Sequence, residues 1–103
     1  MGMQYDVKAS KPITASGQIK DQGDNDLGRV RIKTIYGISG NAAGSVVFYD
    51  GTSNTAPVLI TLEAPAKADS GTFWLPLPGE GILAENAVYG EVTNAASVMV
   101  VYG

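Results

Sequence analysis

The sequence predicts a single all-β domain: a β-sandwich, jelly-roll-like, with seven or eight mostly antiparallel strands. Three observations predict this fold. Apolar residues alternate with polar ones or stand in short β-branched runs, which is the pattern of strands rather than of helices. Turn-forming residues recur about every eight to twelve positions, as in sandwiches and barrels. The length of 103 residues suits one domain with one core.

The first part of the chain is polar until its clearest strand begins. We expect residues 1–11 to form a polar N-terminal arm and residues 12–103 to form the domain. A weak strand is expected at 12–20, followed by a loop at 21–26 that is rich in Asp, Asn and Gly. The stretch RVRIKTIYGIS, residues 29–39, alternates most clearly. It predicts a buried face with Val30, Ile32, Tyr36 and Ile38, and a wet face with Arg29, Arg31 and Lys33.

The middle of the chain predicts a hairpin and an edge strand. Residues 45–50 and 57–64 read as two strands whose connecting loop opens at Asp50-Gly51. Residues 72–77 (TFWLPL) predict a strand that Pro76 confines to an edge or a strand end. Alternation places Phe73, Leu75 and Leu77 on one face of this strand and Trp74 on the other.

The remaining residues predict a corner and the closing strands. Gly79 and Gly81 supply positive φ at a corner around Glu80. Strands are expected at 82–85 and 86–92 and, after a turn at 93–96, at 97–103. The last of these is apolar on both faces, so we expect it to be central in a sheet or covered by a neighbouring subunit.

The residue types present exclude several classes of enzyme and metal site. The chain has no histidine and no cysteine, which removes Ser-His-Asp and Cys-His catalysis and ordinary zinc sites. The spacing of the acidic residues singles out no carboxylate pair of the kind that glycosidases use. Gly79-Glu80-Gly81 lacks the Gly-Lys-Ser/Thr ending of a phosphate loop. We therefore expect no enzyme, no catalytic residues, no cofactor and no metal.

Asp21, Asp24 and Asp26 leave one alternative open, which is a Ca²⁺ loop. The EF-hand pattern also needs a central glycine and a terminal glutamate. In this chain the glycines stand at 23 and 28 and no glutamate follows. A solvated turn is the preferred interpretation, because Asp, Asn and Gly are ordinary turn formers.

Charge is low and unevenly spread along the chain. Charged residues make up 17% and the net charge is −3. Residues 1–33 hold six Lys/Arg against four Asp/Glu, whereas residues 34–103 hold one Lys against six Asp/Glu. This balance argues against nucleic-acid binding, and the absence of a long apolar run argues against membrane spanning or secretion. The uneven distribution of charge along the chain suits docking between copies or on an acidic partner.

The docking hypothesis names a basic and an aromatic set of contacts. For the basic side we expect Lys8, Lys11, Arg29, Arg31 and Lys33, although a solvated strand face remains the simpler interpretation of the last three. For packing between copies we expect Trp74, Tyr89 and Tyr102. An alternative use of Trp74, together with Tyr36, Tyr49, Tyr89 and Tyr102, is a platform for sugars.

Four segments resemble one known group of proteins. They are GSVVFYDG (44–51), VLITLEAP (58–65), LPGEGI (77–82) and NAASVMVVYG (94–103). Together they resemble small all-β structural proteins of tailed bacteriophages, over roughly residues 29–103. Residues 1–28 lie outside the resemblance.

The resemblance implies a virion structural protein, most commonly one that decorates or cements the capsid. Such proteins form trimers or other symmetric oligomers, so the implied partners are copies of the chain and the major capsid protein or another virion protein. The alternative is a carbohydrate- or receptor-binding module of a phage fibre or spike. A hydrolase would need two carboxylates in a cleft, one with a raised pKa.

Overall fold

The structure is a computed structural model that describes residues 8–68 and 71–103. The described residues form nine strands and no helix. The strands are β1 (Lys8–Ala9), β2 (Gly17–Gln18), β3 (Val30–Ser39), β4 (Gly44–Tyr49), β5 (Val58–Ala64), β6 (Thr72–Pro76), β7 (Ile82–Ala84), β8 (Tyr89–Thr93) and β9 (Ala95–Tyr102). The all-β prediction is therefore confirmed. β1 lies in a stretch where the sequence predicts only a polar arm. It pairs with β9 and so adds a strand to those expected.

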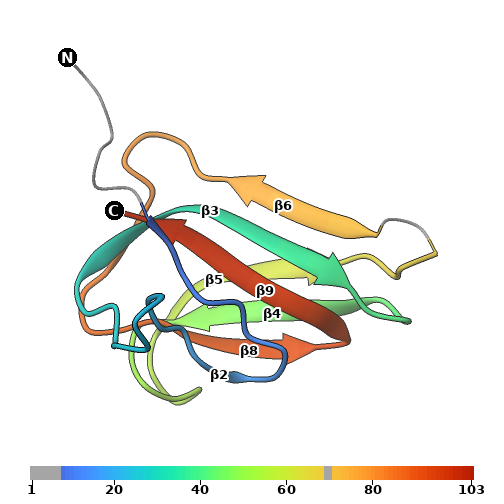
Figure 1. The fold of residues 1–103 in the computed structure, drawn as a ribbon, viewed down its shortest axis with the longest axis horizontal. Coiled ribbons are helices and arrows are strands. Elements are labelled where there is room, and N and C mark those ends of the chain that lie inside the picture. The colour runs from blue at the N-terminus through green and yellow to red at the C-terminus, as the bar shows by residue number, and fades with distance from the viewer. Residues whose placement is uncertain (1–7, 69–70) are drawn as a thin grey trace.

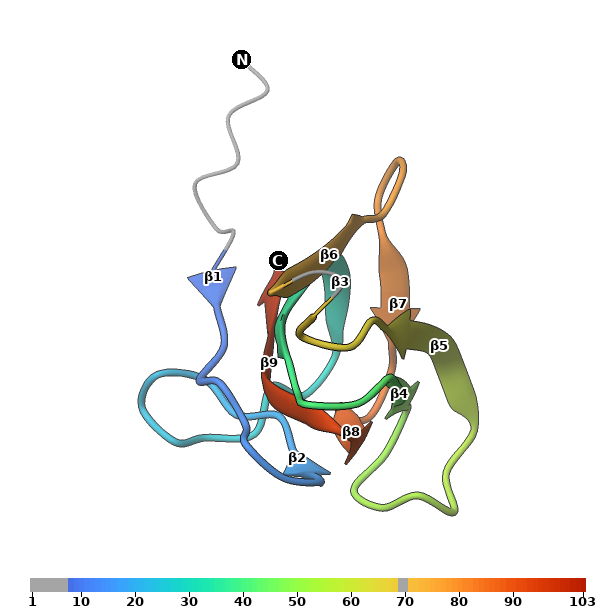
Figure 2. The same cartoon turned by 90° about the vertical axis from the view of Figure 1, so that its right-hand side faces the viewer.

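The strands build two antiparallel sheets. Sheet A has the order β1-β9-β3-β6, with β7 also paired to β3, and sheet B has the order β2-β8-β4-β5. Figures 1 and 2 show β9, β3 and β6 in one layer and β8, β4 and β5 in the other. β9 lies between β1 and β3, and β6 ends the order of sheet A. The expected central position of the last strand and the expected edge position of β6 are both confirmed.

One apolar core fills the space between the sheets. Ile32, Ile35, Val98 and Val100 come from sheet A and meet Phe48 of sheet B, and all five are fully buried. Burying a side chain of this size stabilises the fold by about 1.5–3 kcal/mol. The alternate residues of the same strands therefore point away from the core, and they form the two outer faces of the molecule.

A β-bulge at Lys33 overturns part of the predicted alternation in β3. Ile32 lies opposite Tyr102 of β9, but Thr34 already lies opposite Val101, so Lys33 is an extra residue. Beyond the bulge the inward residue is Ile35, and Tyr36 is exposed. The prediction that Tyr36 and Ile38 are buried is therefore wrong, because one inserted residue moves all following side chains to the opposite face.

The corner at Gly79-Glu80-Gly81 interrupts the edge of sheet A next to this bulge. β6 and β7 both pair with β3, on either side of Lys33, and the backbone N–H of Leu77 donates to the Lys33 carbonyl at 2.9 Å. Gly79 has φ 62° and Gly81 has φ 82°. The predicted role of the two glycines is confirmed, since both adopt the left-handed conformation that favours glycine.

Candidate binding face

The outer face of sheet A has an uncharged area over β6, the second half of β3 and β9. Its nine positions lie in three cross-strand rows over β6, β3 and β9. The rows are Pro76, Thr34 and Val101; Trp74, Tyr36 and Met99; and Thr72, Ile38 and Ser97. An uncharged sheet face of this kind is suited to contact with another apolar surface rather than with bulk water.

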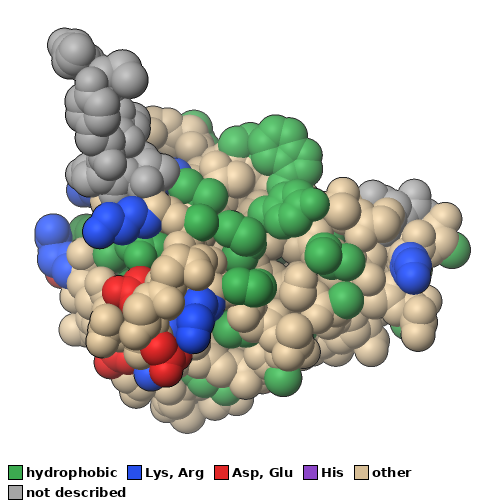
Figure 3. Space-filling view, viewed as in Figure 1, with side chains coloured by type: hydrophobic (Ala, Val, Ile, Leu, Met, Phe, Trp, Pro, Cys, Tyr) green, Lys and Arg blue, Asp and Glu red, His purple; other side chains and the backbone are tan. Residues whose placement is uncertain are grey.

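Three large side chains make this face apolar. Trp74 is 62% exposed, Ile38 44% and Tyr36 40%. Figure 3 shows hydrophobic side chains gathered over β6 and β3. Trp74 lies directly opposite Tyr36 across β6 and β3, at the short spacing of cross-strand neighbours. The predicted outward placement of Trp74, with Phe73 buried on the other side, is confirmed.

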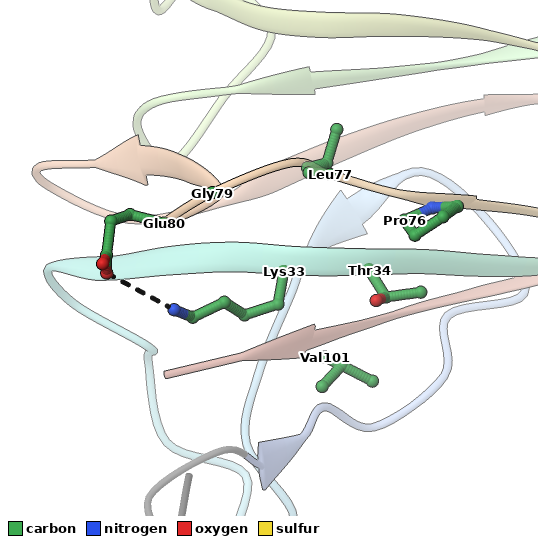
Figure 4. A pocket seen from close by; sticks show the side chains of 7 residues that line it. All are labelled: Lys33, Thr34, Pro76, Leu77, Gly79, Glu80 and Val101. Carbon is green, nitrogen blue, oxygen red and sulfur yellow. Dashed lines mark ion pairs between the residues drawn. The ribbon is translucent and has the colours of Figure 1, made fainter. Parts of the chain in front are cut away.

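A hollow of about 520 Å³ adjoins the aromatic pair. Its walls come from β3, β6, β9 and the loop after β6, namely Lys33, Thr34, Pro76, Leu77, Gly79, Glu80 and Val101. The Lys33 Nζ atom lies 3.8 Å from Glu80 Oε1, and Figure 4 shows the two side chains reaching toward each other. The hollow therefore combines apolar walls with one cation and one carboxylate at its rim.

The outer face of sheet B has a different chemistry, because it carries acidic groups. Glu63 pairs with Ser45 across the strands and Glu91 pairs with Val47, on the side opposite the buried Phe48. The Tyr49 hydroxyl donates to Glu91 Oε1 at 2.8 Å. This hydrogen bond, together with partial burial and the Glu91 charge, raises the pKa of Tyr49.

The structure divides the predicted aromatic contacts among three places. Trp74 lies on the outer face of sheet A. Tyr89 lies in sheet B and packs edge-on against Tyr49, with ring centroids 6.2 Å apart. Tyr102 is 7% exposed and belongs to the core, which leaves little of its ring for a second copy.

Three of the five predicted basic contacts, Lys11, Arg29 and Lys33, have an acidic neighbour within the same chain. Lys11 lies 3.6 Å from Asp24, and Arg29 lies 3.9 Å from Glu85. Lys8 and Arg29 line a second hollow, together with Tyr102. Arg31 pairs through its backbone with Gly103. Lys33 stands apart from the other basic residues, at the hollow beside Trp74.

The acidic loop around Asp21 is a compact turn. Asp21 Oδ1 accepts hydrogen bonds from the backbone N–H groups of Gly23 and Asn25, both at 2.9 Å. Asp26 lies 3.3 Å from Lys20. Among residues 8–68 and 71–103, no three His, Cys, Asp or Glu side chains gather in a group that could hold a metal ion. These contacts support the interpretation of the loop as a solvated turn.

The sequence predicts the outward placement of Trp74 but not the rest of the face. Its alternation puts Tyr36 and Ile38 in the core, although Tyr36 is also named with Trp74 in the alternative sugar platform, and it gives no position for Met99. Nothing local in the sequence marks the bulge, because its position depends on pairing with β9. Trp74 was found because β6 alternates without interruption.

Comparison of the chain with protein-family models, curated proteins and solved structures finds no match. In the part of the chain that the structure describes, no helix is long and apolar enough to cross a membrane.

Proposed function

We propose that this protein is a non-enzymatic structural protein of a tailed-phage virion, which decorates or cements the capsid surface as a symmetric oligomer. The observation that carries the proposal is the uncharged outer face of sheet A, with Trp74, Tyr36 and Ile38 exposed. Apolar patches of this kind on a small protein mark contact surfaces. The resemblance of residues 44–51, 58–65, 77–82 and 94–103 to phage structural proteins supplies the virion context.

We further propose that the fold is a jelly-roll sandwich. Without the short β7, the eight remaining strands in chain order give sheets of order 1-8-3-6 and 2-7-4-5. This is the order that results when an antiparallel strand ribbon is wound into two sheets, as in a jelly roll. Jelly rolls are common in viral capsid domains and in lectins, so the strand order favours both the virion role and its main alternative.

For the shell contact we assign the basic side around Lys8 and Arg29, which line one hollow beside Tyr102. The test is cosedimentation of the purified protein with empty capsids. The wild type should pellet with the capsids, and Lys8→Glu combined with Arg29→Glu should weaken binding, because acidic groups then face an acidic partner. Equal pelleting of the variant would contradict this contact, and no pelleting of the wild type would contradict the capsid role.

The oligomer is tested by light scattering. A trimer has a mass of about 32 kDa, three times the 10.7 kDa of the chain. A mass of 10.7 kDa at every concentration would contradict self-association.

A second candidate function is carbohydrate or receptor binding at a phage fibre or spike. It is favoured by the exposed rings of Trp74 and Tyr36 beside a hollow that offers Thr34, Lys33 and Glu80 as polar groups. Because the chain has a single tryptophan, its fluorescence reports directly on this place. Saturable quenching by oligomers of glucose, galactose or N-acetylglucosamine is the expected result for this function, and an unchanged spectrum contradicts binding of those sugars.

A further inference from the structure

We propose that copies of this chain join by inserting Trp74 of one copy into the hollow between Pro76 and Val101 of another. This inference rests on the self-association proposed above. It adds the contact itself: a protruding side chain and a matching recess on the same face.

The shape of the face provides the first argument. Trp74 protrudes from β6, and its side chain is not part of the wall of its own hollow. The hollow begins two residues further along β6, at Pro76, and measures about 520 Å³. Pockets of roughly 300–1,000 Å³ hold drug-sized molecules, so an indole ring fits. Each copy therefore carries both halves of one contact.

The chemistry of the hollow matches an indole ring. Pro76 and Val101 supply apolar walls, whereas the Leu77 side chain points away from the hollow and packs against the core. Buried tryptophan usually finds an acceptor for its N–H group, and the 81%-exposed Glu80 carboxylate stands at the rim. The Lys33 ammonium group beside it offers a cation–π contact with the ring. An apolar anchor that also satisfies its one polar atom is typical of the centre of protein interfaces.

Charge favours a second copy as the occupant. The chain carries a net charge of −3, so two copies repel each other wherever their acidic groups meet. The nine positions on the outer face of sheet A hold no charge, whereas Glu63 and Glu91 lie on the opposite side of the molecule. A contact through sheet A leaves both acidic faces in solvent and far apart.

An interface of standard size needs only a modest part of the molecular surface. It measures 41 × 33 × 24 Å, and the view down the shortest axis in Figure 1 looks onto sheet A. A standard interface buries about 800 Å² per partner, which is roughly a seventh of the total surface of 5579 Å². In a dimer the two insertions are reciprocal, and in a ring each Trp74 enters the next copy.

The test measures mass by light scattering over a range of concentrations. Trp74→Ala should raise the concentration needed for association by more than about tenfold, as loss of a central anchor does. Val101→Glu, which places a carboxylate in the hollow beside Glu80, should have a similar effect. Val58→Ala is the matched control, because Val58 is 57% exposed but lies on β5 in sheet B. It should associate as the wild type does.

A mixture of the two variants provides the sharper test. Trp74→Ala retains the hollow and Val101→Glu retains the tryptophan, so the mixture should associate more strongly than either variant alone. In the mixture only Val101→Glu carries a tryptophan, and its emission should shift to the blue as the ring is buried. If Val101→Glu does not fold, Thr34→Tyr fills the same hollow from β3 and adds no second tryptophan.

The outcomes that overturn the contact differ from those that overturn the virion role. Unchanged association of Trp74→Ala, or no recovery in the mixture, contradicts the insertion while leaving an oligomer in place. A monomeric wild type whose emission is quenched by N-acetylglucosamine oligomers assigns the face to a glycan and overturns the insertion. A monomeric wild type that still pellets with capsids overturns the insertion but not the capsid role. Association that depends on Trp74, in a protein that does not bind capsids, supports the insertion but not the capsid role.

Discussion

At the residue scale, Gly37 determines how Phe73 enters the core. The two residues are cross-strand partners, and a Cβ atom at Gly37 would overlap the Phe73 ring. The tip of the ring therefore occupies the space that a side chain at position 37 would need. The sequence shows only a glycine inside a strand, which usually weakens a strand. Its packing role could not be predicted, because it depends on the register between β3 and β6.

Gly37→Ala should lower the free energy of unfolding by roughly 1–3 kcal/mol, the usual cost of overpacking a core. Urea denaturation measures the change. Gly17→Ala in β2 is the matched control, since a Cβ there would meet only the Ala15 carbonyl at 4.0 Å. Equal midpoints for the two variants would show that the Phe73 ring can move aside.

The ionisation of Asp50 is coupled to the fold. Its carboxylate accepts hydrogen bonds from the backbone N–H groups of Glu85, at 3.0 Å, and Asn86, at 2.8 Å. Partial burial opposes ionisation, but the N–H groups of Asn86, Glu85 and Ala87 outweigh it and hold the pKa of Asp50 below its ordinary value of 3.8. The sequence identified Asp50 only as a turn opener.

A lowered pKa in the folded state means that ionised Asp50 stabilises the fold at pH values above 3.8. This contribution should be lost as the pH falls from 3.8 to the lower pKa that Asp50 has in the folded state. Asp50→Asn should therefore be less stable than the wild type at neutral pH, by up to about 1 kcal/mol after solvent screening. The difference should shrink in acid. Thermal unfolding at several pH values measures it, with Glu63→Gln as control; a difference independent of pH would contradict the argument.

At the element scale, strand positions could be predicted but the face of one strand could not. Apolar runs bounded by turn residues predict β4, β5, β6 and β9 near their observed ranges, because both signals are local. Pro76 marked the edge, and Gly79 and Gly81 marked the corner, because their backbone preferences are local. The bulge at Lys33 is set by a distant partner strand, so Tyr36 was assigned to the wrong side.

The two corner glycines should differ in how much they resist substitution. Both have positive φ, but a Cβ at Gly79 would meet open space, whereas one at Gly81 would overlap the Ile32 carbonyl. Gly79→Ala should lower the free energy of unfolding by about 1 kcal/mol, because alanine is disfavoured in the left-handed conformation. Gly81→Ala should lower it by clearly more and should also weaken pairing between β7 and β3. Urea denaturation compares them, and equal costs would show that the loop absorbs the overlap.

At the scale of the whole molecule, the fold changes the meaning of the charge pattern. The sequence is basic over residues 1–33 and acidic beyond, which suggested docking through the basic part. In the fold, Lys11, Lys20, Arg29 and Lys33 each have a carboxylate within 4 Å. The nine uncharged positions of sheet A over β6, β3 and β9 come from three distant segments, which no count along the chain could reveal.

Salt should therefore distinguish the two kinds of contact between copies. Association through the uncharged face does not depend on opposite charges, and screening reduces the repulsion between copies of net charge −3. From about 0.1 M to about 1 M sodium chloride, where the screening length falls from about 10 Å to about 3 Å, the light-scattering mass should stay constant or rise. Dissociation at high salt would instead show that the copies meet through basic residues and acidic partners, because only such a contact is weakened by screening.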